Sequence, residues 1–285
     1  MVRAENEMTD QATVIPMRTR PFLRWAGGKT KFVQEILSRL PPLPPKATYY
    51  EPFLGAGAVF LAYAPHRAVL SDLNPDLIHT FTSVRNHPAD VVKKLYALHN
   101  RDSEDSYYRV RKQFNGGGSA SLQAARFIYL NQTSFNGIYR VNRQGQYNVP
   151  YGFKPEPNIP GKRELEAASV LLKRATITLA DYKQVLSDAA NGDVVYLDPP
   201  YPPLNGTSYF THYTKERFAI EEQIGVAQTA DALRGRGCTV IVTNADIPLI
   251  RKIYSRWNVS EITRPRWITS SYHKHRVVEL IFTSN

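Results

Sequence analysis

Residues 192–203 read GDVVYLDPPYPP. The run 194–197 is apolar and rich in β-branched side chains, and a turn-forming Gly-Asp pair precedes it, which predicts a buried parallel strand. This strand ends abruptly at the tetrapeptide Asp198-Pro199-Pro200-Tyr201. Open α/β sheets bind their ligands at the carboxyl ends of the strands, so the tetrapeptide is predicted to lie at a binding site.

Strand-like and helix-like segments alternate on both sides of this motif. Residues 48–64 indicate a strand, a glycine turn and a helix, and residues 68–84 repeat that order. Two more strands are predicted at 175–181 and 238–244, and a long helix is predicted at about 221–234. The alternation predicts an α/β fold with a mostly parallel sheet.

An insertion within the sheet domain and a hairpin near the carboxyl end complete the predicted organisation. Residues 86–174 are basic and helical in pattern, with a loop rich in Tyr, Asn, Gly and Pro, so we expect a mainly helical insertion with a hairpin loop. Residues 259–284 show strand character on both sides of a polar turn, which predicts a terminal antiparallel hairpin. The sheet domain then comprises residues 21–85 and 175–285. Residues 1–20 are expected to form a mobile leader without a targeting role.

The charge balance favours a polyanionic partner. The chain has 285 residues, with 36 Lys and Arg against 25 Asp and Glu, a formal net charge of +11 and a pI near 9.6. Such a surface attracts nucleic acid, although charge alone does not separate DNA from RNA or anionic lipid. Simple solubility is the alternative explanation.

The remaining composition is that of an ordinary globular protein of the cytoplasm. The mean hydropathy is −0.37, and no apolar run approaches the roughly 20 residues of a membrane span. The single cysteine, Cys238, lies in an apolar run and is expected to be a buried thiol. One cysteine excludes an intramolecular disulfide, which suits a reducing compartment.

The EPFLGAG stretch, residues 51–57, has the composition of a turn between a strand and a nucleotide-binding helix. Gly55 and Gly57 allow a tight turn and a close approach of a ligand to the backbone. Asp72 ends the next predicted strand, where a carboxylate can accept hydrogen bonds from ribose hydroxyls. Phe60 stands where a dinucleotide fingerprint has its third glycine, which disfavours a nicotinamide or flavin site. A generic turn is the alternative.

The FLRWAGGKTK stretch, residues 22–31, contains Gly-Gly-Lys-Thr but is not a phosphate loop. No buried strand precedes it, and Leu23 occupies the place of the first glycine. Trp25 can cover an aromatic or sulfonium group, and Lys29 can hold a carboxylate. A structural turn before a helix is the alternative.

The tetrapeptide at 198–201 has the chemistry to bind an amino group on a flat base. Prolines are stiff and lack N–H groups, so their carbonyls are available as acceptors. The Asp198 carboxylate and the Pro199 carbonyl can accept both N–H bonds while Tyr201 stacks on the ring. The amine lone pair is then directed at an electrophile. The alternative is that Asp198 caps a turn and Tyr201 packs in the core.

On these motifs the chain resembles the Dam-type DNA adenine-N6 methyltransferases, the D12 class or group alpha. The resemblance runs from Phe22 nearly to the carboxyl end, and the shared segments occur in the same order: FLRWAGGK, EPFLGAG, SDLNPDLI, YLNQTSFNGIYRVNRQGQYNVPYG, VVYLDPPYPPL, YFTHYT and ITSSYHKHRVVEL. It implies a Rossmann-like S-adenosylmethionine-dependent methyltransferase sheet. Residues 86–174 then form a target-recognition insertion that binds DNA.

The resemblance also assigns residues to roles. It assigns catalysis to Asp198, Pro199, Pro200 and Tyr201. It assigns cofactor contacts to Trp25, Ala26, Gly27, Gly28, Lys29, Glu51, Phe53, Gly55, Gly57, Asp72, Asp181, Tyr182 and Asp198. Simple packing is the alternative for Tyr182.

DNA contacts are expected in the polar loop of the insertion and in the terminal turn. The candidates are Asn131, Asn136, Arg140, Asn142, Arg143, Asn148, Tyr151, Lys274 and Arg276. Asn136 precedes a glycine and is equally typical of a turn, and the terminal turn is equally typical of a solvated surface. The segment 210–213 lies where the family varies in sequence. The resemblance therefore does not decide whether it closes over the flipped base.

The resemblance implies a site-specific DNA methyltransferase that modifies adenine N6 in duplex DNA by base flipping, with S-adenosylmethionine as methyl donor and no metal. Double-stranded DNA is the expected partner, and a cognate restriction enzyme is a possible second one. No membrane is expected, and the expected location is the cytoplasm of a bacterium or of a phage-infected cell, in contact with the nucleoid. The alternatives are methylation of cytosine N4 or of an RNA base, and a DNA-binding regulator without catalysis.

Overall fold

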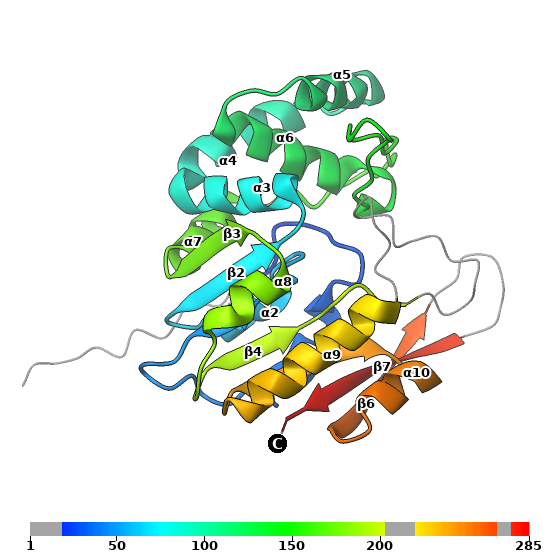
Figure 1. Cartoon of the computed structure of the whole chain (residues 1–285). Helices are drawn as coiled ribbons and strands as arrows, with labels where there is room; N and C mark the ends of the chain where they lie inside the picture. Colours follow the sequence, from blue (N-terminus) through cyan, green and yellow to red (C-terminus); the bar gives the residue numbers. More distant parts are fainter. Residues whose placement is uncertain (1–18, 203–219, 267–274, 285) are drawn as a thin grey trace, which may run out of the picture.

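The computed structural model describes residues 19–202, 220–266 and 275–284, and Figure 1 shows a sheet layer beneath a layer of helices. The sheet has seven strands in the order β3-β2-β1-β4-β5-β7-β6. Its parallel strands are β1 (Tyr49–Glu51), β2 (Ala68–Asp72), β3 (Ala175–Leu179), β4 (Val194–Leu197) and β5 (Thr239–Ala245). The antiparallel hairpin consists of β6 (Asn258–Arg266) and β7 (His275–Thr283).

Helices cover both faces of this sheet. One face packs against η1 (Lys29–Lys31), α1 (Val33–Leu37) and α2 (Ala58–Tyr63). The other packs against α8 (Tyr182–Val185), η3 (Leu186–Asp188), α9 (Ile220–Gly235) and α10 (Pro248–Ile253). Successive strand residues point to opposite faces, so Tyr49 lies in the first core and Tyr50 in the second. Burial on both faces explains why the parallel strands are continuous apolar runs.

A helical layer sits beside the sheet. It contains α3 (Pro75–Asn86), α4 (Pro88–His99), α5 (Glu104–Asn115), α6 (Ala120–Thr133), η2 (Phe135–Gly137) and α7 (Lys162–Leu172). Helix α6 is buried along most of its length because α3, α4 and α5 surround it. Helices α3 and α7 also contact β3, and the helical layer shares one continuous core with the first face of the sheet. The helical layer is therefore packed firmly against the sheet.

The structure confirms the predicted fold class. The mostly parallel sheet, the terminal hairpin and the long helix α9 are all present. The strand order reverses between β1 and β4, and a ligand site is expected outside their carboxyl ends. The division into residue ranges 21–85, 86–174 and 175–285 stays a prediction. In the part of the chain that the structure describes, no helix is long and apolar enough to cross a membrane.

Candidate active site and DNA-facing surface

The loops after β1 and β2 are joined by one carboxylate. Gly55 and Gly57 have positive φ values of 48° and 66°, which glycine adopts without strain. The Gly55 amide donates to Asp72 Oδ2 at 3.1 Å, and the Asn74 amide donates to Asp72 Oδ1 at 2.9 Å. Partial burial raises the pKa of Asp72, although these amides oppose the rise. Next to it, Leu73 is 53% exposed, so an apolar and an acceptor side chain lie next to each other at the carboxyl end of β2.

Glu51 supports the glycine loop through hydrogen bonds. Its side chain is buried, and its Oε2 accepts hydrogen bonds from the Tyr49 hydroxyl at 2.7 Å and the Phe60 amide at 2.9 Å. Burial raises the pKa of Glu51 to about 8. A contact between Glu51 and the cofactor stays a prediction.

Tyr182 likewise packs against other parts of the protein. It is buried, its ring lies 5.4 Å from that of Phe53, and its hydroxyl approaches Gly225 of α9 closely. Tyr182 is therefore packed among protein side chains in this structure, and its contact with the adenine of the cofactor stays a prediction. Asp181 caps α8 by accepting from the Lys183 amide at 2.9 Å, and it remains partly exposed.

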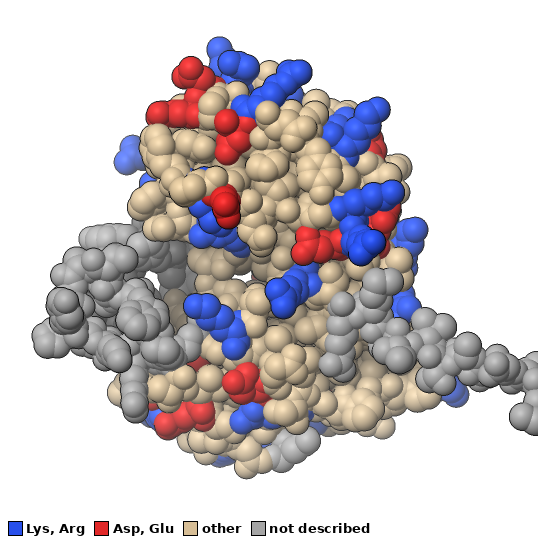
Figure 2. Space-filling model, turned by 180° about the vertical axis from the view of Figure 1, so that it is seen from behind, with Lys and Arg blue, Asp and Glu red and all other residues tan. Residues whose placement is uncertain are grey.

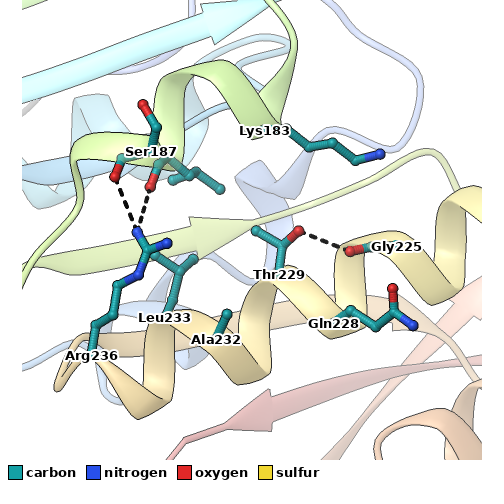
Figure 3. Close-up of a pocket in the computed structure, with 9 residues that line it drawn as sticks. Lys183, Ser187, Gly225, Gln228, Thr229, Ala232, Leu233 and Arg236 are labelled. Atoms are coloured by element: carbon teal, nitrogen blue, oxygen red, sulfur yellow. Dashed lines mark hydrogen bonds between the residues drawn. The ribbon is translucent and has the colours of Figure 1, made fainter.

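A surface groove of about 370 Å³ runs between η3 and α9 (Figure 3). It is lined by Lys183, Gly225, Thr229 and Arg236, among others. The Arg236 guanidinium donates to the Ser187 carbonyl at 3.1 Å, so this cation ties two elements together. None of the predicted site residues lines the groove.

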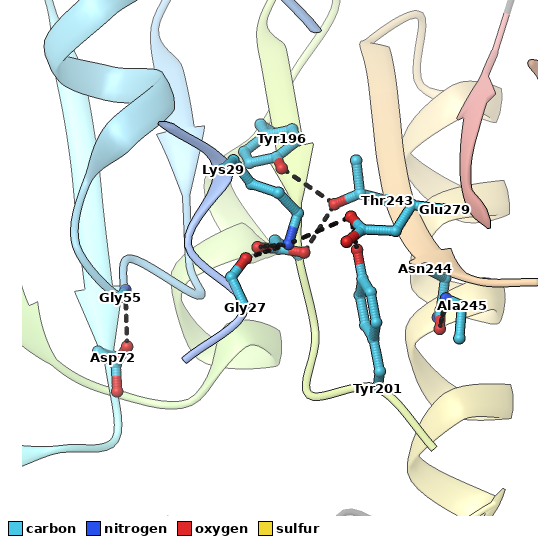
Figure 4. A network of polar contacts seen from close by, with 11 residues as sticks. Gly27, Lys29, Gly55, Asp72, Tyr196, Tyr201, Thr243, Asn244, Ala245 and Glu279 are labelled. Atoms are coloured by element: carbon cyan, nitrogen blue, oxygen red, sulfur yellow. Dashed lines mark hydrogen bonds and ion pairs between the residues drawn. The ribbon is translucent and has the colours of Figure 1, made fainter. Parts of the chain in front are cut away.

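The amino-terminal motif brings Lys29 into contact with the catalytic motif. The Lys29 ammonium lies 2.7 Å from Asp198 Oδ2, donates to the Gly27 carbonyl at 2.7 Å and sits 4.7 Å from the centre of the Tyr201 ring (Figure 4). Its side chain is only 4% exposed. Lys29 therefore faces Asp198 here, and a contact with a cofactor carboxylate stays a prediction.

The four residues after β4 form a rigid ledge that protein groups hold from behind. Thr243 of β5 donates to Asp198 Oδ1 at 2.7 Å. The amide of Gln223 from α9 donates to the Pro200 carbonyl at 2.7 Å, whereas no described residue donates to the Pro199 carbonyl. Asp198 itself keeps 18% of its side chain exposed. The two acceptors left for a ligand are thus the Asp198 carboxylate and the Pro199 carbonyl.

The remaining members of the amino-terminal motif line the same region. Ala26 and Gly27 are exposed, and Gly28 and Trp25 are half-buried. The Trp25 ring stacks on Tyr139 at 5.7 Å between centres, and a methyl group on Gly55 would meet Trp25 at 3.0 Å. Trp25 therefore packs against the glycine loop, which explains why that loop needs glycine.

Asn131 holds the amino-terminal motif. Its side chain is 2% exposed, its Oδ1 accepts from the Arg24 amide at 2.7 Å, and its Nδ2 donates to the Arg24 carbonyl at 2.8 Å. Both ends of the amide thus bind backbone in this structure, and a direct DNA contact by Asn131 stays a prediction. The neighbouring Asn136 is exposed, has a φ of 55°, and accepts from Arg24 through its carbonyl.

The polar loop is partly self-supporting. Arg140 donates to the side chain of Asn148 at 2.8 Å, and the Asn142 side chain accepts the amides of Gln144 and Gln146. The Tyr151 hydroxyl donates to Asp102 at 3.2 Å. These side chains give the loop its shape.

Arg143 is exposed within the same loop. A groove of about 410 Å³ separates this loop from α5, and Arg111 and Lys112 are among the residues that line it.

Two exposed aromatic side chains were missed by the sequence reasoning. Phe135 is 51% exposed and Phe153 is 67% exposed. They belong to neighbouring segments, because the Phe135 amide donates to the Pro150 carbonyl at 2.9 Å and Ser134 pairs with Tyr151. The signal was present in the sequence as phenylalanines within a polar loop.

Some predicted residues cannot be placed. Lys274 and the segment 210–213 lie outside the described residues. Arg276 belongs to β7, but its side chain is not described. Among the described residues, no group of three or more His, Cys, Asp or Glu side chains could hold a metal ion.

Comparison with known proteins decides the family. Residues 25–270 match the D12 class N6 adenine-specific DNA methyltransferases. This chain belongs to that family. It is 34% identical to the type II methyltransferase M1.LlaDCHI of Lactococcus lactis subsp. cremoris, with 93% of this chain and 95% of the relative covered. It is also 34% identical to the DNA adenine methylases of Vibrio cholerae (93% and 95% covered) and Escherichia coli K12 (89% and 91% covered). As a member of the D12 class, the chain is a site-specific adenine DNA methyltransferase whose methyl donor is S-adenosylmethionine.

The buried Glu51 predicts a pH-dependent stability. Its folded-state pKa of about 8 lies above the ordinary value, so the protonated form is favoured and its contribution is lost as the pH rises towards 8. Wild type should therefore lose about 2–4 kcal/mol relative to Glu51→Gln between pH 5 and pH 8.5. Urea unfolding of both proteins at the two pH values measures this. A constant difference between them would contradict the assignment.

Proposed function

We propose that this chain methylates the N6 amino group of an adenine that is flipped out of duplex DNA. One observation carries the proposal: Asp198 stands at the tip of β4, fixed by Lys29 and Thr243, with the Pro199 carbonyl and the Tyr201 ring beside it. Two acceptors beside an aromatic face suit an exocyclic amine of a base. Base flipping is required because N6 is paired inside the helix.

The residues of the pocket fit the methyl donor. Asp72 and the half-exposed Leu73 offer an acceptor and an apolar surface to a nucleoside. Trp25, which packs on Gly55, and the exposed Gly27 are the nearby groups of the amino-terminal motif. When bound, S-adenosylmethionine supplies an electrophilic methyl group on a positively charged sulfur. No metal is needed in this scheme, because a methyl group on a sulfonium already carries an excellent leaving group, the neutral thioether.

The protein's task is to position and polarise the amine. Asp198 and the Pro199 carbonyl accept hydrogen bonds from the two N–H groups of N6. This arrangement turns the nitrogen lone pair towards the methyl carbon. The new N–C bond forms as the C–S bond breaks with its electron pair going to sulfur. Positive charge thereby moves onto N6, and one N6 proton is then lost to water. Asp198 acts as an acceptor throughout and does not need to be a strong base.

The DNA-facing surface is proposed to lie where basic and aromatic side chains meet. Figure 2 shows Lys and Arg side chains above and below a hollow on one face of the molecule. Arg143 and Arg111 suit phosphate contacts, and the exposed Phe135 and Phe153 suit stacking on bases. Arg140, Asn142 and Asn148 shape the loop that presents them. Asn136, Tyr151, Lys274 and Arg276 stay proposed contacts.

Two other functions make different predictions. A cytosine-N4 or RNA methyltransferase would share the amine-binding ledge, and a regulator would bind DNA without transferring a methyl group. Incubation with methyl-labelled S-adenosylmethionine and duplex DNA, followed by mass spectrometry of the nucleosides, separates them. We expect N6-methyladenine from duplex DNA. Labelled cytosine, label on RNA only, or no label would reject the proposal.

The biological setting follows from the substrate. We propose that the chain acts on chromosomal or phage DNA in the cytoplasm. Similarity to a protein named as a type II methyltransferase supports a second proposal, that a restriction endonuclease of the same specificity is its partner in the cell.

Replacing Asp198 should abolish methylation without unfolding the protein. Asp198→Ala removes one amine acceptor, and we expect methyl transfer to fall by at least about 1,000-fold, the scale for loss of a central electrostatic contact. Asp188→Ala, an exposed aspartate of η3, is the matched control and should keep wild-type activity. Labelled-methyl transfer and circular dichroism are the measurements. Wild-type activity in Asp198→Ala would refute the assignment.

Removing an exposed ring should weaken DNA binding. Phe135→Ala deletes a stacking surface, and base–aromatic stacking is worth about 1–3 kcal/mol, so affinity should fall about 5- to 100-fold. Val170→Ala, which changes an exposed apolar residue of α7, serves as the control. Fluorescence anisotropy with a labelled duplex measures both. Equal affinities would exclude Phe135 from the interface.

A further inference from the structure

Gln223 of α9 and Asn244 of β5 are two buried amide side chains behind the ledge of residues 198–201. Gln223 is 1% exposed and Asn244 is 0% exposed. The Gln223 Nε2 donates to the Pro200 carbonyl at 2.7 Å, and the Asn244 Nδ2 donates to the Gln223 Oε1 at 2.9 Å. The Asn244 Oδ1 in turn accepts from the Ala245 amide at 2.8 Å (Figure 4). These hydrogen bonds form a continuous amide chain from the backbone of β5 to the ledge.

The direction of this amide chain is set by its two ends. A backbone N–H can only donate and a backbone carbonyl can only accept, whereas a side-chain amide has both a donor and an acceptor. The Ala245 amide binds the Asn244 oxygen, so the Asn244 nitrogen faces Gln223. Gln223 then turns its oxygen towards Asn244 and its nitrogen towards Pro200. Only this orientation of the two amides satisfies all of these hydrogen bonds, and it presents a donor to the ledge.

Strand β5 supports the ledge from both of its faces. Neighbouring residues of a strand point to opposite faces of the sheet. Thr243 donates directly to Asp198 Oδ1 at 2.7 Å, and the next residue, Asn244, supports Pro200 through the amide chain. The residues on either side of Pro199 are therefore both held from the same strand.

The last residue of the ledge is held separately. Glu279 of β7 pairs with Ala245 of β5, and its Oε2 accepts from the Tyr201 hydroxyl at 3.1 Å (Figure 4). That contact is made to a side chain, whereas Gln223 binds the backbone of the ledge. Losing the amide of Gln223 would therefore act on the backbone that carries the proposed acceptor carbonyl.

We infer that Gln223 is a positioning residue for methyl transfer and that Asn244 sets the orientation of its amide. This inference rests on the proposed function. By holding Pro200, Gln223 keeps the Pro199 carbonyl and the Asp198 carboxylate in the relative positions that the two N–H groups of N6 require. A misplacement of about 1 Å in such groups can cost about 100-fold in rate, so the support has a measurable effect on the methyl-transfer step.

Gln223→Glu makes the donor to the ledge dependent on pH. A protonated carboxyl group can donate to the Pro200 carbonyl and accept from Asn244, as the native amide does. An ionised carboxylate can only accept, so it repels the Pro200 carbonyl and breaks the amide chain. Burial raises the pKa of a carboxyl group, which brings its protonation into an accessible pH range.

The measurement is the single-turnover rate constant on unmethylated plasmid DNA, divided by that of wild type at the same pH. For Gln223→Glu we expect this ratio to rise about 10- to 100-fold as the pH is lowered from about 9 to about 6. The titratable groups around the ledge are present in both proteins, so the ratio removes their own pH dependence. A residue that only anchors α9 would not produce a recovery of rate on protonation.

Three further variants sharpen the result. Gln223→Leu removes the donor at every pH and should lower the rate constant about 10- to 100-fold throughout, with the dissociation constant for DNA changed less than about threefold, because phosphate contacts dominate that affinity. Asn244→Asp cannot donate to Gln223 when it is ionised, so its rate should also recover as the pH falls. Gln228→Glu makes the same chemical change at an exposed position of α9 and should keep the wild-type rate at each pH.

Three outcomes would overturn the inference alone. The first is a wild-type rate in Gln223→Leu, and the second is a rate ratio for Gln223→Glu that does not change with pH. The third is a loss of rate that follows the fraction of folded protein, measured by circular dichroism at each pH, which would make Gln223 a purely structural residue. If Gln223→Leu does not fold, Gln223→Glu decides by itself.

Methylation by wild type distinguishes these failures from a failure of the proposed function. If wild type forms no N6-methyladenine, the proposed function fails and the inference fails with it. If wild type forms N6-methyladenine, each variant tests only the role of the amide chain.

Discussion

The buried ion pair between Lys29 and Asp198 is the contact on which the arrangement of the site depends. It joins the amino-terminal motif to the tip of β4, two segments that are far apart in the sequence. Burying two charges is costly unless further polar groups satisfy them. Here the Gly27 carbonyl and the Tyr201 ring share Lys29, and Thr243 satisfies Asp198. The pair therefore fixes the direction of the Asp198 carboxylate, the group proposed to bind the amine.

The same amino-terminal segment joins the helical layer to the sheet. The Asn131 side chain of α6 forms hydrogen bonds with both the amide and the carbonyl of Arg24. The Arg24 guanidinium donates to the Asn136 carbonyl at the start of the polar loop. The next residue, Trp25, packs on Gly55 of the glycine loop. One short segment is thus in contact with both the proposed DNA-facing loop and the proposed cofactor pocket. A displacement of the polar loop would therefore also displace Trp25, because close-packed contacts transmit displacement.

Local sequence patterns were sufficient to predict the sheet and the tetrapeptide at 198–201. They were not sufficient to predict which side chains surround them. Alternating strands and helices and the tetrapeptide at 198–201 are encoded by adjacent residues, so they were predictable. Glu279 could not be found in this way, because its place follows from the register of β7 against β5. Asn131 and Tyr182 stay predicted ligand contacts, although each also packs within the protein. Polar and aromatic residues suit both binding and buried packing, and adjacent residues do not distinguish those two roles.

The two prolines of the ledge have different tasks, which explains why both are needed. A loop without N–H donors cannot fix itself by its own backbone, so another element must supply the donor. Gln223 of α9 does so: it is 1% exposed, donates to the Pro200 carbonyl and accepts from Asn244 at 2.9 Å. With Pro200 bound from behind, the Pro199 carbonyl is the one that can turn towards a base. Preorganised acceptors need no rearrangement when a ligand binds, so in the proposed reaction the support that α9 gives to Pro200 contributes to catalysis.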